Sequence, residues 1–474
     1  MNVPSRLLIG GRWVATDRQL PVVNPFTGEI FAQAPLGDAS QLRDAVAAAD
    51  ACFPGVRTLP SHQRAALLRA VADQIQERAN EFAETIVAEA GKPITSAETE
   101  VARCVMTFQV AAEEAGRAHG EVLPMDALPP GEGHVGLTRR FPVGVVAAIT
   151  PFNFPLNLVA HKVAPCLATG NTMVVKPASK TPLTALLLAE VLVAAGMPEG
   201  QVNFVTCDSS DIDALVLDER VRKVTFTGSP AVGWELKRKC ADKRVTLELG
   251  GNAGCIVHTD ADLEAAVRMI ATGAFSQAGQ SCISVQRIVV HQDRYDEFRA
   301  QLLNHLAARI KTGDPRDRQT VVAPMITATA LDKIRQRIAE AIERGARIVH
   351  GGGVKGNCLE ATVIEEAPVD CELCTEEAFA PIVTLHRYRD IEEAIAIVNN
   401  SRFGLQAGVF TRDLPLAMHA FETLEVGGVM INQVPTFRIE SMPYGGVKRS
   451  GFGREGLRYA MEEMTELRSL IIKL

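Results

Sequence analysis

Val145-Val146-Ala147-Ala148-Ile149 is an apolar, strand-like run, and Thr150-Pro151-Phe152-Asn153-Phe154-Pro155 follows it as a strand-to-helix turn. Further strand-like runs at residues 172–176, 202–206, 221–225 and 245–249 alternate with helix-like segments. A βαβ series of this kind predicts a parallel, doubly wound sheet that binds its ligands at the carboxyl ends of the strands. This part of the chain therefore predicts the fold class, α/β, and the edge of the sheet where a site should lie.

The alternation resumes after Asn252 and predicts a second α/β domain. Strand-like runs occur at residues 287–291, 346–350, 381–387 and 408–410, and amphipathic helices such as residues 331–344 separate them. Before the first series, residues 1–35 are expected to form short strands and turns, and residues 38–118 helices. The tail contains Ser469-Leu470-Ile471-Ile472, an apolar strand with nothing after it to cover its edge, which favours pairing with another subunit.

Composition limits the class of protein. A chain of 474 residues exceeds a single core, and its 47% hydrophobic and 22% charged residues are an ordinary globular balance. The net charge of -7 gives no reason to expect nucleic acid or a membrane as partner. Ten cysteines over this length, no signal peptide and no apolar run of about 18 residues predict a cytoplasmic protein rather than a disulfide scaffold or a membrane protein.

Three short motifs are expected to carry no function. Two G-x-G-x-x-G matches, at residues 351–356 and 451–456, lack the βαβ context of a dinucleotide fingerprint, so we interpret both as turn glycines. Cys371-x-x-Cys374 has no second ligand pair, so we predict no metal site. A better candidate for a phosphate is the segment at residues 226–233, which follows a strand and opens a helix with Ser229 as N-cap and Pro230 at the first helical position.

Three segments offer reactive side chains. They are Gln277-Ala278-Gly279-Gln280-Ser281-Cys282-Ile283, Leu247-Glu248-Leu249-Gly250-Gly251-Asn252 and the turn that contains Asn153. A thiol nucleophile, a carboxylate base and an amide donor are what acyl transfer through a thioester requires. Each residue also has a structural interpretation: Cys282 as a small buried apolar residue, Glu248 as a strand-end carboxylate in solvent, and Asn153 as a turn residue.

Taken in order along the chain, these segments resemble the aldehyde dehydrogenase superfamily. The resemblance runs from Gly10-Gly11-Arg12-Trp13 to Tyr444-Gly445-Gly446-Val447-Lys448 and includes Lys176-Pro177-Ala178-Ser179, Phe226-Thr227-Gly228-Ser229 and Glu376-Glu377-Ala378-Phe379. It implies two doubly wound α/β domains, a Rossmann-like cofactor domain (1–123 and 143–251) and a catalytic domain (252–445). It also implies a small β oligomerisation element (124–142 and 462–474) and a homodimer or homotetramer.

The resemblance also assigns the chemistry. It implies that Cys282 attacks the aldehyde to give a thiohemiacetal, that Asn153 stabilises the oxyanion, and that hydride leaves to NAD or NADP. Glu248 then activates the water that hydrolyses the thioester on Cys282 to release the acid. The alternatives are a coenzyme A-acylating dehydrogenase, against which Glu248 counts, and a non-catalytic binding or structural protein on the same fold.

The resemblance places a set of residues around the cofactor: Thr150, Pro151, Phe152, Lys176, Ser179, Gly228, Ser229, Gly233, Leu249, Glu377 and Phe379. Ser179 stands where many NAD-specific members carry an acid that binds the ribose 2′-hydroxyl. Without that carboxylate a 2′-phosphate is not repelled, and Lys180 could attract it, so we expect NADP to be accepted alongside NAD.

A second set falls on the wall of the substrate tunnel: Arg103, Phe154, His161, Ser281, Arg438 and Tyr444. Two arginines and a histidine in one funnel would attract a carboxylate, phosphate, phosphonate or sulfonate. In the alternative interpretation, Arg103 and Arg438 pair with local acids such as Glu98 and Glu440. We therefore expect a short polar aldehyde, which these charges predict to be anionic. Lactaldehyde-like, semialdehyde-like and phospho- or phosphonoaldehydes are candidates, and the sequence does not name one.

Overall fold

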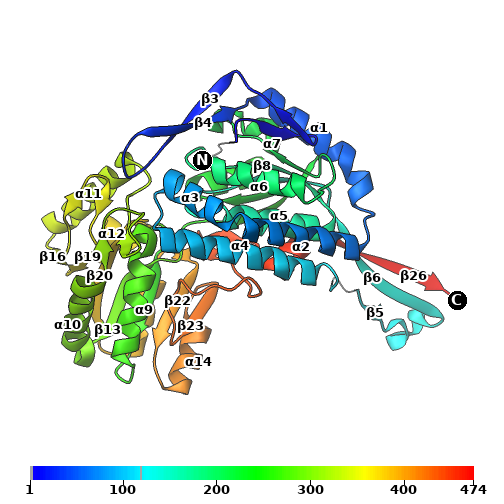
Figure 1. Ribbon diagram of the computed structural model, residues 1–474. Helices are drawn as coiled ribbons and strands as arrows, with labels where there is room; N and C mark the ends of the chain where they lie inside the picture. The colour runs from blue at the N-terminus through cyan, green and yellow to red at the C-terminus, as the bar shows by residue number, and fades with distance from the viewer. Residues whose placement is uncertain (1–3, 118–119) are drawn as a thin grey trace.

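The computed structural model describes residues 4–117 and 120–474. An eight-stranded sheet lies at its centre, in the order β2-β1-β9-β8-β7-β10-β11-β25 (Figure 1). Its middle strands are β7 (Val145–Ile149), β8 (Thr172–Lys176), β9 (Val202–Phe204), β10 (Val221–Thr227) and β11 (Arg244–Glu248). These five strands are parallel, which confirms the predicted doubly wound series. Antiparallel strands close both edges: β1 (Leu7–Ile9) and β2 (Arg12–Val14) on one side, β25 (Gly451–Phe452) on the other.

Helices cover both faces of this sheet, and the strand residues alternate between two cores. In β7, Val146 and Ala148 pack into a core with one set of helices, whereas Val145 and Ala147 face the other. The first set is α2 (Ser61–Glu77), α3 (Ala79–Ala90), α4 (Ile94–Glu114), α5 (Asn157–Thr169), α6 (Leu183–Ala194) and α15 (Leu457–Glu463). The second is α1 (Ala39–Val56), α7 (Asp213–Val216) and α8 (Pro230–Lys239). Burial on both faces explains why these strands are continuous apolar runs.

A seven-stranded sheet forms the second α/β unit, in the order β16-β19-β20-β13-β12-β22-β23. Its strands are β12 (Ala253–Val257), β13 (Val285–His291), β16 (Arg347–His350), β19 (Thr362–Glu365), β20 (Ile382–Tyr388), β22 (Gln406–Phe410) and β23 (Gly428–Ile431). Its helices are α9 (Leu263–Phe275), α10 (Gln292–Arg309), α11 (Ala328–Glu343), α12 (Glu372–Thr375), α13 (Ile391–Asn399) and α14 (Leu414–Thr423). All four predicted strands lie in this sheet, while β12, β19 and β23 were not predicted.

Short elements join the two units. The hairpin of β3 (Arg18–Val23) and β4 (Ile30–Leu36) crosses from the first unit to the second along the top of Figure 1. Small pairs are β14 (Lys311–Thr312) with β15 (Thr320–Val322), β17 (Val354–Lys355) with β18 (Cys358–Leu359), and β21 (Phe403–Gly404) with β24 (Val447–Lys448). Neither G-x-G-x-x-G segment belongs to a βαβ unit: the first contains β17, and the second begins with the antiparallel edge strand β25. Glycines 351, 352, 356, 453 and 456 have positive φ, as expected for turn glycines, whereas Gly451 lies in β25.

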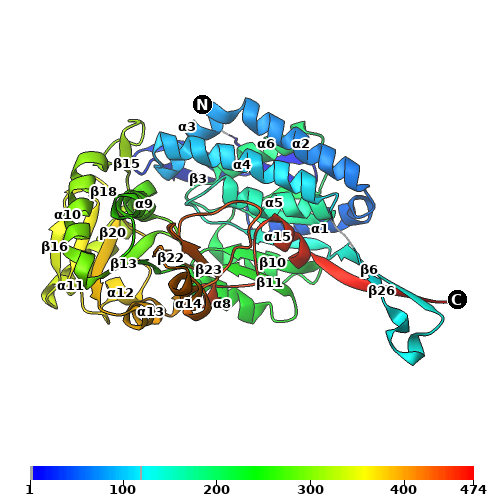
Figure 2. The same ribbon diagram turned by 90° about the horizontal axis from the view of Figure 1, so that it is seen from below.

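A three-stranded sheet projects from the body, at the right of Figures 1 and 2. The tail strand β26 (Thr465–Lys473) pairs with β6 (His134–Pro142) over nine residues, and β5 (Val122–Leu123) pairs with the other edge of β6. The second edge of β26 has no partner strand within the described chain, and Leu467 and Leu470 are each 55% exposed. Among the residues described, no helix is long and apolar enough to cross a membrane.

Candidate active site

Three segments bring the reactive residues together, two from the carboxyl ends of strands in the first sheet and one from the connection that precedes β13 in the second. Asn153 follows β7, Glu248 is the last residue of β11, and Cys282 follows the short helix η4 (Ser276–Gly279) in the second unit. Hydrogen bonds lock two of these segments: Asn153 Nδ2 donates to the Gln280 carbonyl at 3.0 Å, and Gln277 Nε2 donates to the Asn153 carbonyl. A side-chain amide carries two N–H groups, so Asn153 keeps one for a ligand.

An unusual turn presents Cys282. Gln277, Ala278 and Gly279 have φ of 55°, 56° and 63°, so three consecutive residues are left-handed, two of them not glycine. Such backbone is costly for residues with a Cβ and persists where the surroundings determine it. Here Gln277 is held by Asn153, and a Cβ at Gly279 would stand 2.2 Å from the Ala380 carbonyl oxygen. The strain therefore lies in the turn that ends three residues before the candidate nucleophile.

Cys282 is enclosed. Its sulfur lies 3.1 Å from the Tyr444 hydroxyl oxygen, and it packs beside Ile283 and Leu405. Burial raises the pKa of the thiol, and the contact with Tyr444 opposes this shift. A group that donates a hydrogen bond to the sulfur therefore favours its ionisation.

Glu248 is buried, with 3% of its surface exposed, so its interpretation as a strand-end carboxylate in solvent is wrong. Burial raises its pKa well above the usual value, and the negative charge of Glu455 adds to the shift. Neither carboxyl oxygen has a hydrogen-bond partner among the described residues. The two glycines that follow it allow close packing, since a Cβ at Gly250 would lie 2.4 Å from the Glu377 carboxylate and one at Gly251 2.2 Å from the Cys282 carbonyl oxygen.

A cavity of about 640 Å³ opens at the carboxyl edge of the first sheet. Nine of the eleven residues expected around the cofactor line it: Thr150, Pro151, Phe152, Lys176, Gly228, Ser229, Leu249, Glu377 and Phe379. Phe152 and Phe379 meet edge to face with ring centroids 5.7 Å apart. Glu377 accepts the Gly251 N–H at 3.0 Å, and burial raises its pKa to about 7.

Two expected cofactor residues, Ser179 and Gly233, do not line this cavity. Ser179 lies beside Lys176, which does line the cavity, and its hydroxyl accepts a hydrogen bond from Lys176 Nζ at 3.3 Å. Gly233 lets α8 pack closely on the strand end, because a Cβ there would lie 2.4 Å from Leu249 Cδ2. Ser229 precedes Pro230 as predicted, but its side chain makes no capping hydrogen bond.

A second cavity of about 440 Å³ reaches Cys282 from the other side. All six residues expected on the tunnel wall line it: Arg103, Phe154, His161, Ser281, Arg438 and Tyr444. Cys282 lines both cavities, whereas Asn153 and Glu248 line the first. The thiol therefore stands where the two cavities meet.

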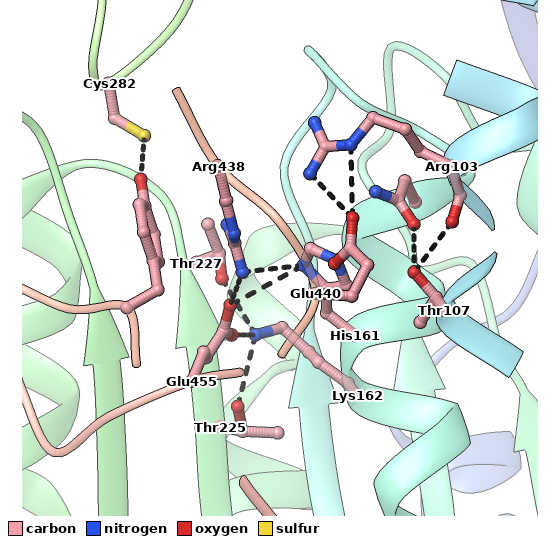
Figure 3. A network of polar contacts seen from close by, with 12 residues as sticks. Arg103, Thr107, His161, Lys162, Thr225, Thr227, Cys282, Arg438, Glu440 and Glu455 are labelled. Carbon is pink, nitrogen blue, oxygen red and sulfur yellow. Dashed lines mark hydrogen bonds and ion pairs between the residues drawn. The ribbon is translucent and has the colours of Figure 1, made fainter. Parts of the chain in front are cut away.

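Carboxylates lie behind the two arginines of the second cavity (Figure 3). Arg103 donates twice to one oxygen of Glu440, at 2.8 and 3.1 Å, and Arg438 contacts Glu455 at 3.3 Å. His161 links the two ion pairs: its Nδ1 accepts a hydrogen bond from Arg438 at 2.9 Å, and its Nε2 donates one to Glu440 at 2.6 Å. The pairing alternative is thus right for Arg103 and Glu440, and Arg438 uses Glu455 instead. Both arginines nevertheless line the cavity.

Sequence reasoning missed three members of this network: Lys162, Glu440 as the partner of His161, and Glu455. Lys162 Nζ bonds Glu455 at 2.9 Å and the Thr227 hydroxyl at 2.8 Å. Although burial alone would raise the pKa of Glu455, the charges of Lys162 and Arg438 lower it to about 2. A lysine inside the mostly apolar α5 was the available signal, since a buried cation requires a partner. Glu455 was visible only as part of a glycine-rich motif.

The Cys371-x-x-Cys374 pair is buried at the start of α12, and no cluster of metal-ligating side chains occurs at residues 4–117 or 120–474.

The fold and the three reactive segments agree with the similarity of this chain to known proteins. The sequence matches the aldehyde dehydrogenase family over residues 13–470. It is 42% identical to a 3-sulfolactaldehyde dehydrogenase of Priestia aryabhattai over 469 residues, which cover 99% of this chain and 98% of that protein.

Solved structures agree. Aldehyde dehydrogenase 21 from Physcomitrella patens, in complex with the reaction product succinate, superposes with a TM-score of 0.97 at 41% identity, covering 100% of this chain and 99% of that one. The glyceraldehyde-3-phosphate dehydrogenase GapN from Methanocaldococcus jannaschii, complexed with NADP, gives a TM-score of 0.93 at 38% identity, covering 97% and 100%. The molecule is an α/β oxidoreductase of the aldehyde-oxidising class. This chain belongs to the aldehyde dehydrogenase family, which confirms the resemblance found in the sequence.

Proposed function

We propose that this enzyme oxidises a short anionic aldehyde to the carboxylic acid with NADP or NAD, through a thiohemiacetal and a thioester on Cys282. The observation that carries the proposal is the position of Cys282 where the two cavities meet. A thiol there can hold the aldehyde carbon from the second cavity and present it to a group bound in the first. Hydride transfer from the aldehyde carbon to that bound group then needs no movement of the substrate.

The first cavity fits a nicotinamide dinucleotide. Helix α8, ten residues long, begins there after Gly228 and Ser229, and a helix N-terminus favours a pyrophosphate. Lys176 and Glu377 would hold the two riboses, and Phe379 the nicotinamide ring. The dinucleotide, when bound, supplies the hydride acceptor. No carboxylate stands at Ser179, which supports acceptance of a 2′-phosphate, and the GapN relative was solved with NADP.

The chain's own residues perform the remaining steps. The Cys282 sulfur bonds the aldehyde carbon, and the free N–H of Asn153 donates to the oxygen that becomes negative. After oxidation the thioester carbonyl occupies the same place. Glu248, once deprotonated, takes a proton from water, which attacks the thioester carbon and releases the acid and the thiol.

Charge supports the substrate class. Arg103 and Arg438 face the second cavity, and each has a carboxylate partner, Glu440 and Glu455, that does not line it. A guanidinium offers a planar, two-pronged set of donors to a carboxylate, sulfonate or phosphate. Sulfolactaldehyde, succinate and glyceraldehyde-3-phosphate, in the names of three relatives, each carry such a group. We infer that the same end of the tunnel holds the anion here.

The experiment is a panel of aldehydes of matched length that end in a sulfonate, carboxylate, phosphate, hydroxyl or methyl group. Reduced nicotinamide is followed by absorbance with NADP and with NAD, and Cys282→Ala serves as the blank. A kcat/KM at least about tenfold higher for anionic than for neutral aldehydes is expected. Preference for neutral aldehydes would overturn the substrate class, and acyl transfer to added coenzyme A in place of acid release would favour the acylating alternative.

The domain and subunit assignments are also part of this proposal. We infer that residues 1–123 and 143–251 bind the cofactor, that residues 252–445 carry the nucleophile, and that residues 124–142 and 462–474 join subunits. The open edge of β26 and its exposed apolar side chains support a homodimer or homotetramer. Sedimentation of the wild type and of a chain truncated before β26 tests this.

A further inference from the structure

Tyr444 was expected only as part of the tunnel wall, yet its hydroxyl points at the nucleophile. The Tyr444 Oη to Cys282 Sγ distance is 3.1 Å, and within residues 4–117 and 120–474 no other side chain lies at hydrogen-bonding distance from this sulfur. The tyrosine is 3% exposed, so its hydroxyl makes this contact from a largely buried position. A hydroxyl placed there interacts with the reacting atom itself.

The ring of Tyr444 is held in place from three directions. Its backbone exchanges hydrogen bonds with Glu455, at 3.0 and 2.6 Å. Ile283 and Leu405 pack against its side chain. The guanidinium of Arg438, drawn in Figure 3, lies 3.6 Å from the ring centroid. The direction of the hydroxyl is therefore determined by the fold and not by the occupant of the tunnel.

The hydroxyl is suited to donate. Burial raises the pKa of Tyr444 well above its usual value, with the nearby Cys282 as a second cause, so the phenol keeps its proton at any physiological pH. A cation above the ring face draws electron density from the phenol, which strengthens its O–H as a donor. A hydrogen bond to a charged acceptor is stronger than one to a neutral acceptor, so this donor favours the thiolate over the thiol.

We propose that Tyr444 is a catalytic residue whose hydroxyl donates a hydrogen bond to the Cys282 sulfur and stabilises the thiolate that attacks the aldehyde. The proposal rests on the proposed function only in naming Cys282 as the nucleophile. The hydrogen bond acts on the ionisation of Cys282, in which the thiol loses one proton to the solvent and becomes the thiolate. Asn153 is left free for the aldehyde oxygen, so the sulfur and the oxygen have separate donors.

The test is Tyr444→Phe, which removes the hydroxyl and keeps the ring. The rate of Cys282 alkylation by iodoacetamide is measured against pH in the full-length enzyme, with the modified peptide identified by mass spectrometry. The apparent pKa of Cys282 should rise by about one to two units, as expected for loss of a hydrogen bond to a charged group. At a fixed pH below that pKa, alkylation and the kcat/KM for the aldehyde should each fall at least about tenfold.

The matched control is Tyr388→Phe. Tyr388 is also fully buried, and its hydroxyl bonds His258 Nδ1 at 2.7 Å in the second unit, away from the site. The Tyr388→Phe variant should leave the alkylation profile of Cys282 unchanged. A Tyr444→Phe profile that overlays the wild type would overturn the proposal, as would an equal shift in the control.

If Tyr444→Phe does not fold, Arg438→Met replaces it. This change keeps the hydroxyl but removes the cation above the ring, and an unshifted pKa of Cys282 would contradict the argument. Alkylation needs neither aldehyde nor cofactor, so the result does not depend on the substrate class.

Discussion

Arg438→Leu should separate anionic from neutral aldehydes. The guanidinium lines the second cavity, its side chain is 6% exposed, and Glu455 lies behind it at 3.3 Å. Removing it leaves the anionic end of a substrate without that partner in a largely desolvated tunnel. Glu455 keeps Lys162 at 2.9 Å, so the network behind the cavity retains one ion pair and the fold should survive.

The magnitude follows from the kind of bond lost. A hydrogen bond to a charged group contributes about 1.5–3 kcal/mol. Since each 1.4 kcal/mol is a factor of about ten, KM for the anionic aldehyde should rise roughly 10- to 100-fold. Arg103 also faces the cavity and remains, which places the expected value toward the lower end. A neutral aldehyde of equal length loses no charged bond, so its KM should change less than about threefold.

The assay compares the two aldehydes in wild type and variant by reduced-nicotinamide absorbance. Any effect of Arg438 on Tyr444 and Cys282 appears equally with both substrates, so the ratio of their kcat/KM values isolates the anion contact. Arg69→Leu is the control for lost charge, because Arg69 is exposed and lines neither cavity. Equal losses for both aldehydes, or a wild type that prefers long apolar ones, would refute the reasoning.

Three further predictions concern the base, the oxyanion donor and the cofactor. Glu248→Gln should give a burst of reduced cofactor followed by slow turnover, seen by stopped-flow absorbance; deacylation at the wild-type rate would remove Glu248 as the base. Because burial and Glu455 raise the pKa of Glu248, wild-type deacylation should increase with pH through that raised value, and the variant should lack this limb. Asn153→Ala should lower kcat roughly 10²–10³-fold in steady-state assays, the usual effect of losing one oxyanion donor; a loss under about tenfold in a folded variant would place the oxyanion site elsewhere. Wild type should bind NADP at least as well as NAD in fluorescence titrations, and Ser179→Glu should shift the preference to NAD by repelling the 2′-phosphate; a strong wild-type preference for NAD that the substitution leaves unaltered would contradict the argument.

Local pattern was sufficient for much of the fold. The five parallel strands of the first sheet are apolar runs buried on both faces, so their hydrophobicity marks them without knowledge of their neighbours. β12, β19 and β23 were not predicted, because periodicity alone does not distinguish a short apolar strand from another buried segment. The catalytic trio was suggested by three motifs whose residues are far apart in the chain.

The sequence alone determined the family, the fold class and the residue types of the site, because motif order and strand-helix alternation are properties of the chain itself. Only the tertiary structure decided how those residues are charged and paired. Glu248 is buried and lacks a partner, Arg438 pairs with Glu455, and the Tyr444 hydroxyl meets the Cys282 sulfur. These facts depend on burial and on contacts that only the folded chain makes; Cys282 and Tyr444, for example, are separated by 162 positions. No local pattern encodes such a distance, so the electrostatics of the site emerge only when the chain has folded.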